Sequence, residues 1–176
     1  KGISFIDAMF TSTSAVCVTG LAVVDTGTYF TGFGISVIAI LIQVGGLGIM
    51  TFASYFSYFF RGGTSYENQL MLSDMSNVEK LGEVFSTLKK IILVTFIIEF
   101  IGALLIFANI SSTIFPDFLD RCYFSIFHSI SGFCNAGFST LSNSFYEPAF
   151  RFNYPLHLIL ALLFITGSCQ SQSGPN

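Results

Sequence analysis

Charged side chains are scarce in this sequence. Of its 176 residues, 7 are Lys or Arg and 10 are Asp or Glu, together 10%, whereas 52% are hydrophobic. A soluble domain carries about 25% charged residues. The composition therefore excludes an ordinary soluble domain and predicts a protein whose solvent is lipid. The chain also lacks a basic stripe, which excludes nucleic acid as a partner.

Cysteine is sparse too, and its spacing excludes two common kinds of site. No CxxC pair occurs, so we expect neither a zinc site nor a thioredoxin-like motif. We expect free thiols at all four positions, which are Cys17, Cys122, Cys134 and Cys169. The serines show no nucleophile motif with a paired base, so we expect no enzyme. A signal peptide is also missing, and the apolar start of the chain suggests that it begins inside a larger protein.

What the sequence does have is long runs without charge. Residues 35–60 contain no charged residue, and this run is long enough to cross a bilayer with some tilt. Residues 91–110 form a second span that only Glu99 interrupts, and residues 155–167 begin a third. We expect an all-α, multi-pass protein of the cell (plasma or inner) membrane. Residues 168–176 form an atypical polar tail, which we expect to fray.

The basic residues are distributed unevenly between these spans. Four of the seven lie within Arg61–Lys90, and short loops rich in Lys and Arg stay in the cytoplasm. We therefore predict that this connector is cytoplasmic. Residues 1–34 and 111–154 would then lie on the outer side of the membrane.

Two outer segments are neither good spans nor good loops. Residues 3–24 are apolar but rich in Ser, Thr and Ala, and residues 118–141 have a similar composition. Each is too polar to face lipid and too apolar to be a solvated loop. Non-helical backbone at membrane depth is tolerated where it is buried in protein or lines a watery cavity. The sequence therefore predicts two re-entrant helices, each followed by a loop.

The two segments match each other when the chain is shifted by 117 residues. Five identities occur across the 17 aligned positions 5–21, where chance predicts about one. The identical pairs are Phe10 and Phe127, Ser12 and Ser129, Ser14 and Ser131, Cys17 and Cys134, and Gly20 and Gly137. A match on this scale indicates a duplicated structural unit.

Each copy is predicted to be a short helix followed by an extended stretch that ends in glycine. The two stretches are Cys17, Val18, Thr19, Gly20 and Cys134, Asn135, Ala136, Gly137. A dehydrated cation needs a cage of oxygens, and backbone carbonyls provide one without a fixed charge. Glycine accepts the unusual dihedrals that such a stretch requires. Either glycine alone could equally belong to a turn or a helix contact, but their equivalence in the repeat favours a carbonyl-lined cation site.

Other residues permit two interpretations each. Glu99 is either a proton or cation site, or a protonated or hydrogen-bonded glutamate that faces another helix. Gly45, Gly46 and Gly48 could form a hinge, although small residues more often allow close approach of helices in membranes. The two histidines, His128 and His157, lack a second ligand at metal spacing, so packing or interface roles are expected.

Three stretches, TSTSAVCVTGLAVVDTGTYF, LIQVGGLGIMTF and HSISGFCNAGFSTL, resemble the Trk/Ktr/HKT superfamily of potassium transporters, in particular the bacterial Ktr and Trk translocating subunits. With the aligned spans the resemblance covers residues 3–165. In that family one polypeptide holds four repeats of helix, pore loop and helix around one pore, and each repeat provides a quarter of the selectivity filter. The resemblance implies that Gly20 and Gly137 are the filter glycines of repeats one and two.

The resemblance also implies a substrate and partners. Carbonyls of Cys17, Val18 and Thr19, and of Cys134, Asn135 and Ala136, would line the path of potassium, which is the substrate rather than a cofactor. Glycine at position 20 favours potassium, because a serine there accompanies sodium preference in some plant members. The expected assembly is a homodimer in lipid with a cytosolic nucleotide-binding regulatory subunit.

These expectations give a division of the chain. Residues 1–61 would be a first repeat without its outer helix, 62–90 the connector, 91–167 a second repeat up to the start of its inner helix, and 168–176 the tail. The chain would thus be a fragment covering parts of two of four repeats. The expected function is potassium translocation. The alternatives are sodium uptake, a non-conducting fragment with only a structural role in assembly, and, more distantly, a membrane enzyme.

Overall fold

The structure, a computed structural model, describes residues 3–61, 78–111 and 114–172, so that part of the expected connector, residues 62–77, lies outside it. Within the described ranges every regular element is a helix and no strand occurs. The elements are α1 (Phe5–Val16), α2 (Thr26–Tyr29), α3 (Gly32–Arg61), α5 (Val78–Asn109), α6 (Phe118–Phe133), the 3-10 turn η1 (Ser144–Tyr146) and α7 (Tyr154–Gln172). The expected all-α chain is confirmed.

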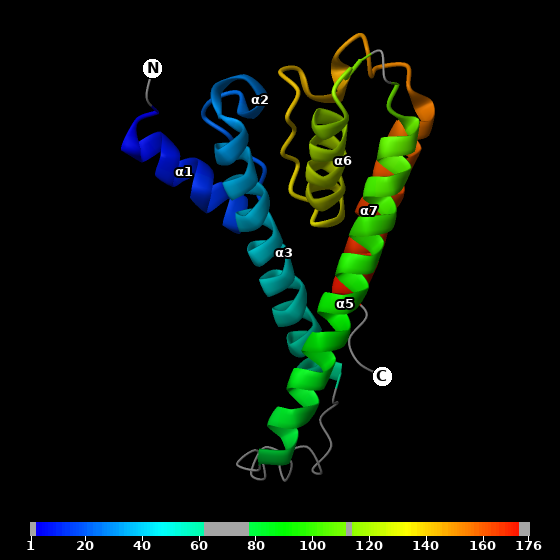
Figure 1. Ribbon diagram of the computed structural model, residues 1–176. Coiled ribbons are helices and arrows are strands. Elements are labelled where there is room, and N and C mark those ends of the chain that lie inside the picture. Colours follow the sequence, from blue (N-terminus) through cyan, green and yellow to red (C-terminus); the bar gives the residue numbers. More distant parts are fainter. Residues whose placement is uncertain (1–2, 62–77, 112–113, 173–176) are drawn as a thin grey trace.

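The short helices α1 and α2 begin at side chains that cap them. The hydroxyl of Ser4 accepts a hydrogen bond from the backbone N–H of Asp7 at 3.2 Å, and the carboxylate of Asp25 accepts one from the N–H of Gly27 at 2.9 Å. Such caps satisfy N–H groups that the first helical turn leaves without partners. The caps fix where both helices start, on the side of the molecule where the loops gather (Figure 1).

One of the two longest helices extends well beyond its apolar run. Helix α3 matches the run at 35–60 closely, but α5 begins at Val78 rather than at 91. Residues 78–90 are rich in Glu, Lys and Leu, which favour helix without being apolar. An apolar run marks the part of a helix suited to lipid, and the helix itself can extend beyond it.

Helix α7 continues through Gln172, past the start of the tail that was expected to fray from residue 168. The amide of Gln170 donates to the hydroxyl of Thr95 at 3.0 Å, and the amide of Asn135 donates to the hydroxyl of Ser168 at 3.3 Å. The polar residues of this segment therefore find partners on α5 and on the loop after α6. Those contacts account for the added helical turns.

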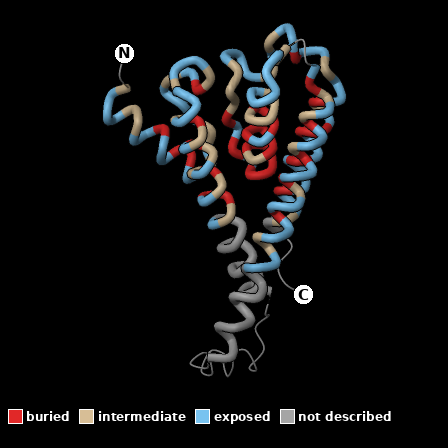
Figure 2. The backbone as a smooth tube through the Cα atoms, viewed as in Figure 1, coloured by how far each residue is buried: buried red, intermediate tan, exposed pale blue. Residues whose placement is uncertain are grey.

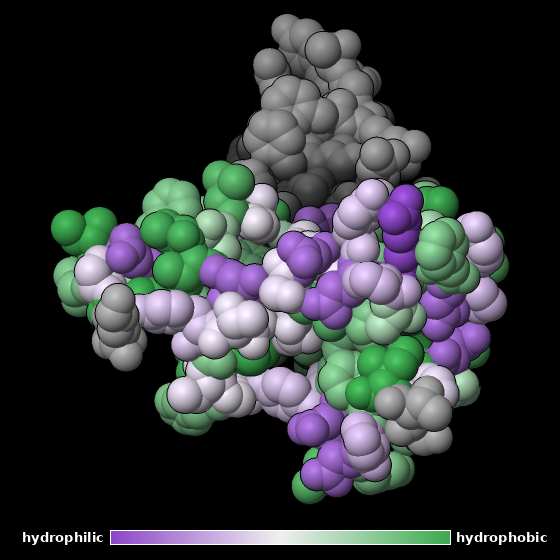
Figure 3. All heavy atoms as spheres, turned by 90° about the horizontal axis from the view of Figure 1, so that it is seen from above, coloured by the Kyte–Doolittle hydropathy of each residue, from purple (hydrophilic) through white to green (hydrophobic). Residues whose placement is uncertain are grey.

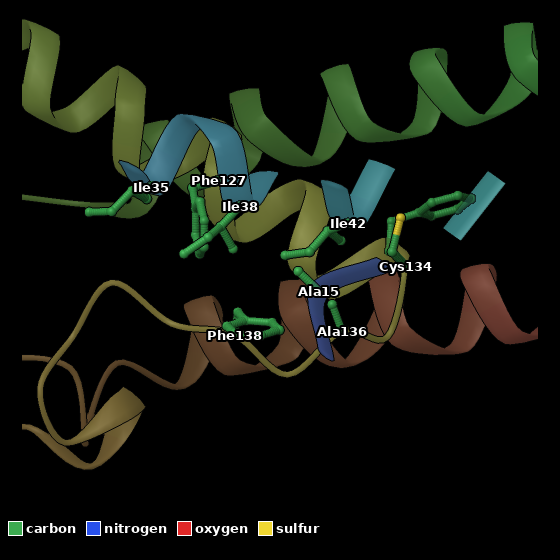
Figure 4. Close-up of a cluster of buried hydrophobic side chains, with 9 residues drawn as sticks. Ala15, Ile35, Ile38, Ile42, Phe127, Cys134, Ala136 and Phe138 are labelled. Carbon is green, nitrogen blue, oxygen red and sulfur yellow. The ribbon is translucent and has the colours of Figure 1, made fainter. Parts of the chain in front are cut away.

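The short helix α6 stands between α3 on one side and the pair α5 and α7 on the other, and it ends well short of their lower ends (Figure 1). Two apolar clusters hold it there. One joins α1, α3, α6 and the loop after α6, with Ile42, Phe127 and Phe138 among its members (Figure 4). The other joins α5, α6 and α7 through Ile106, Phe124 and other buried side chains.

The outer surface of the long helices is apolar. Lys89–Asn109 is long and apolar enough to cross a membrane, and only 22% of its most apolar window is buried inside the structure. Shorter apolar helical stretches occur at Gly32–Gly48 and Tyr154–Gln170. Exposed residues follow these helices along their outer faces (Figure 2), whereas the face formed by the loops, seen from above, carries polar residues with apolar ones at its rim (Figure 3). Helices with apolar outer faces are typical of proteins in lipid.

Candidate functional site

The two predicted stretches lie beside each other. A Cβ added to Gly20 would overlap the carbonyl oxygen of Ala136 and would lie 3.4 Å from the Cα of Gly137. Ala15, at the end of α1, also lies close to Cys134 and Ala136 in the first apolar cluster (Figure 4). The structure thus brings together two stretches that are 117 residues apart in the sequence.

The two stretches turn away from their helices in the same manner. The first three backbone N–H groups of each stretch donate back to the last turns of its own helix, at equivalent positions. The bonds are Cys17 to Thr13 (2.8 Å), Val18 to Ala15 (3.2 Å) and Thr19 to Ser14 (3.0 Å), and then Cys134 to Ile130 (2.9 Å), Asn135 to Gly132 (3.0 Å) and Ala136 to Ser131 (2.8 Å). Donor and acceptor in each bond of the second set are 117 residues beyond those of a bond in the first set, so the backbone geometry repeats with the same offset as the sequence.

The second and fourth residues of each stretch adopt left-handed backbone conformations. The φ angles are 55° at Val18 and 57° at Asn135, and both Gly20 and Gly137 have φ of 73°. Glycine adopts this conformation at little cost. A β-branched residue such as Val18 does so at a cost of about 1–3 kcal/mol. Strain of this kind persists where the surrounding structure imposes it, which is common at functional sites.

The carbonyl groups of these stretches take no part in the hydrogen bonds among the described residues. None of the carbonyls of Cys17–Gly20 or Cys134–Gly137 accepts a hydrogen bond from a described residue, although the N–H groups beside them are bonded. In the part of the chain that the structure describes, no group of three or more His, Cys, Asp or Glu side chains could hold a metal ion. Backbone carbonyls are the ligands from which cation selectivity filters are commonly built.

Two equivalent serines support the ends of the stretches. The hydroxyl of Ser14 accepts a hydrogen bond from the N–H of Leu21 at 2.8 Å, and the hydroxyl of Ser131 donates to the carbonyl of Phe138 at 2.6 Å. Leu21 and Phe138 directly follow the two glycines, and they too are 117 residues apart. Each serine therefore ties the residue after its glycine to the helix before it.

Glycines on the long helices allow the stretches to be approached closely. A Cβ on Gly45 of α3 would overlap the carbonyl oxygen of Val16, and one on Gly46 would lie 2.5 Å from the sulfur of Cys134. The expected close-packing role is therefore confirmed for these two, whereas a Cβ on Gly48 meets nothing within 4 Å. On α7, a Cβ on Gly167 would overlap the carbonyl oxygen of Phe133.

Gly167 was not predicted as a site residue. Val16 and Phe133 are equivalent in the repeat, so Gly45 and Gly167 occupy corresponding places against the last residue of each short helix. The sequence signal is present but displaced, because the two glycines are 122 rather than 117 residues apart. Five additional residues between the second stretch and α7 hide the match.

Two buried polar residues lie close to the second stretch. The carboxylate of Glu99 accepts a hydrogen bond from the Gln43 amide at 3.0 Å, so this glutamate does face another helix, as one of its two interpretations held. His128 is 2% exposed, and the centroid of its ring lies 3.9 Å from the centroid of the Phe124 ring. Its Nε2 lies 3.2 Å from the hydroxyl of Ser139. His128 therefore has the packing role that the sequence suggested.

The two stretches differ in their surroundings. Cys134 and Ala136 are buried, whereas Cys17 and Thr19 are exposed. Helix α5 packs along α6, but no described helix occupies the same place beside α1. The first stretch is therefore open on the side where the second is covered.

An all-helical membrane protein that presents backbone carbonyls in two equivalent loops is the class that this geometry defines. Residues 1–170 match the TrkH family, which is described as a cation transport protein, and the chain belongs to that family. Membership confirms the resemblance found in the sequence and the location in the cell membrane.

Curated relatives cover nearly all of this chain. It is 39% identical over 169 residues to the Ktr system potassium uptake protein B of Bacillus subtilis, with 95% of this chain and 37% of the relative aligned. It is 38% identical over 170 residues to the protein of the same name in Vibrio alginolyticus, with 95% and 36% aligned. It is also 36% identical over 165 residues to the potassium/sodium uptake protein NtpJ of Enterococcus hirae, with 93% and 35% aligned. The chain thus spans just over a third of the length of these relatives.

Proposed function

We propose that this chain supplies two quarters of a potassium pathway within a four-repeat transporter. The observation that supports this most strongly is the pair of equivalent stretches whose carbonyls have no partner among the described residues. In this proposal α6 with α5 and α7 is one helix–pore-loop–helix repeat, and α1 with α3 is another that lacks its outer helix. Carbonyls of Cys17–Gly20 and Cys134–Gly137 replace the water shell of the ion.

The short helices contribute to the same site electrostatically. The C-terminal end of a helix carries a partial negative charge, and α1 and α6 end at Val16 and Phe133, directly before the two stretches. This charge attracts a cation without trapping it, because no ionised side chain lies in either stretch. Binding that is favourable but not too strong is what conduction requires.

Potassium is the proposed substrate because Gly20 occupies the first filter position and two of the relatives are named as potassium uptake proteins. Sodium uptake is a second candidate, which the name of the Enterococcus hirae potassium/sodium uptake protein favours. Relatives named as parts of a Ktr system favour assembly with other subunits. We propose a homodimer with a cytosolic nucleotide-binding regulatory subunit.

The proposal is tested in a transporter in which residues 1–170 replace the matching segment of the Bacillus subtilis potassium uptake protein B. We expect Gly20→Ser and Gly137→Ser to lower the preference for potassium over sodium in uptake assays, since both positions have φ of 73°. The effect of Gly20→Ser should be larger, because a Cβ there also overlaps the Ala136 carbonyl, whereas one on Gly137 meets only the Cα of Gly20 at 3.8 Å.

Gly48→Ser is the matched control, because a side chain at that position meets nothing within 4 Å. It should leave the ion preference unchanged. Unaltered preference in both filter variants, at equal abundance in the membrane, would show that these stretches are not the filter. Uptake that prefers sodium in the unsubstituted transporter would favour the second candidate.

A further inference from the structure

Glu99 is a carboxylate buried in the middle of the membrane-spanning part of α5, and it is 5% exposed. An ionisable group at such depth is costly unless it has partners, and it commonly marks a functional position. Both carboxylate oxygens have a partner. Oε2 accepts from the Gln43 amide at 3.0 Å, and Oε1 accepts a weak hydrogen bond from the thiol of Cys134 at 3.9 Å.

These contacts join three parts of the molecule. Gln43 lies on α3, and Cys134 is the first residue of the second stretch. The backbone carbonyl of Glu99 also accepts a hydrogen bond from the hydroxyl of Ser129 on α6 at 2.6 Å. One residue of α5 is therefore bonded to α3, to α6 and to the beginning of the second stretch.

Among the described residues, the Gln43 side chain makes one hydrogen bond, the one that its amide donates to Glu99. The other side-chain atom of this amide, Oε1, is buried and has no hydrogen-bond partner among the described residues. Helix α3 is held against the same cysteine, because a Cβ on Gly46 would lie 3.0 Å from the Cβ of Cys134. Loss of the Glu99 carboxylate would leave the Gln43 amide buried without any bond, which costs more than the bond itself contributes.

We propose that Glu99 is a positioning residue that sets where the second stretch begins by fixing Cys134 against α3. This inference deepens the proposed function and rests on it in one respect only, namely that the Cys134 carbonyl faces the ion. A displaced carbonyl changes the cage of oxygens that replaces the water shell of the ion, and this cage sets the preference between ions. Glu99 thereby acts on ion preference through Cys134 and does not touch the ion.

The test compares Glu99→Leu with Glu99→Gln in the chimeric transporter described above. The Leu variant removes both acceptors, whereas the Gln variant retains an amide oxygen that can accept from Gln43. N-Ethylmaleimide labelling of Cys134 is followed by mass spectrometry, with Cys122 as the internal reference. We expect labelling to rise about fivefold in the Leu variant, as for the loss of one ordinary hydrogen bond, and to stay near the parent rate in the Gln variant.

Uptake is measured on the same variants. The Leu variant should lose preference for potassium over sodium at equal abundance, and the Gln variant should keep it. Gln43→Leu breaks the bond to Glu99 but leaves Cys134 its acceptor, so it should give a smaller loss than Glu99→Leu, and the double variant should resemble Glu99→Leu because the Gln43 bond is already lost there. Phe100→Leu, at an exposed neighbouring position, is the control and should behave as the parent.

Three results would overturn the inference. One is unchanged labelling and preference in the Leu variant, and another is an equal loss in the Leu and Gln variants, which would assign the effect to charge. The third is additive loss in the double variant. If the unsubstituted transporter takes up no cation, the proposed function fails, and Cys134 labelling alone decides on Glu99.

Discussion

At the scale of the single residue, Gly45 and Gly48 lie about one turn apart on α3, so the same substitution can be compared at a crowded and at an open position. We expect Gly45→Ala to destabilise the protein by about 1–3 kcal/mol, because its Cβ would overlap the Val16 carbonyl and force apart α1 and α3. Gly48→Ala should be stabilising by up to about 1 kcal/mol, because Ala favours helix and its Cβ meets nothing within 4 Å.

Thermal unfolding of the two variants in detergent is the measurement. The midpoint should fall for Gly45→Ala and stay or rise for Gly48→Ala. Equal shifts in the two would contradict the close contact between α3 and the end of α1.

The sequence revealed equivalent residues where the offset of 117 holds, and missed them where it does not. Ser14 and Ser131 stood out because they share an offset with the two glycines that follow them. The role of Gly167 depends on an approach between α7 and Phe133, and five additional residues before α7 remove Gly167 from the offset that the other pairs share. The partner of Glu99 is 56 residues away, so only the packing of α3 on α5 could reveal it.

At the scale of the element, Arg121 closes the upper end of α5. Its Nη2 donates to the carbonyls of Ile110 at 2.8 Å and Phe107 at 3.0 Å, and its guanidinium lies 4.3 Å from the ring of Phe107. The last carbonyls of a helix have no partners within the helix, and a cation is favourable there. Because Arg121 belongs to α6, it also joins the two helices.

We expect Arg121→Leu to lower the stability by about 1–3 kcal/mol, since the change leaves both carbonyls without a charged donor. Hydrogen exchange should speed up in the last turn of α5. Arg151→Leu is the control, because Arg151 is exposed and only stacks on Tyr146 and Phe152, and its effect should stay within about 0.5 kcal/mol. Similar losses in both variants would count against the cap.

The elements themselves were predictable to different degrees. A short helix was expected before each glycine stretch, and α1 and α6 both end directly before those stretches. Hydropathy placed α3 correctly because apolar residues fill most of it. It misplaced the start of α5, which helix-forming polar residues extend, and the end of α7, where polar residues bond to α5 and to the loop after α6.

At the scale of the whole molecule, the orientation in the membrane stays a prediction from the basic residues. We expect a cysteine at position 76 to be labelled by an impermeant thiol reagent only after the cells are opened, because the connector that holds it should be cytoplasmic. A cysteine at Ser144, which is exposed in η1, should be labelled in intact cells.

The native cysteines are replaced for this measurement, and position 76 itself lies outside the described residues. A membrane-permeant reagent that labels both positions provides the control for accessibility. Labelling of position 76 from outside intact cells would reverse the topology.

The neighbouring glycines of α3 constrain how such a protein can be recombined. Gly45 contacts the end of α1, in its own half of the chain, while Gly46 contacts Cys134, in the other half. In a chimera joined between α3 and α5, the two halves would come from different parent proteins. Gly46 would then pack against a foreign loop, and a glycine has no side chain that could adjust to a poor fit. Exchange of one half alone should therefore often fail between diverged parents. The two halves are therefore best exchanged together.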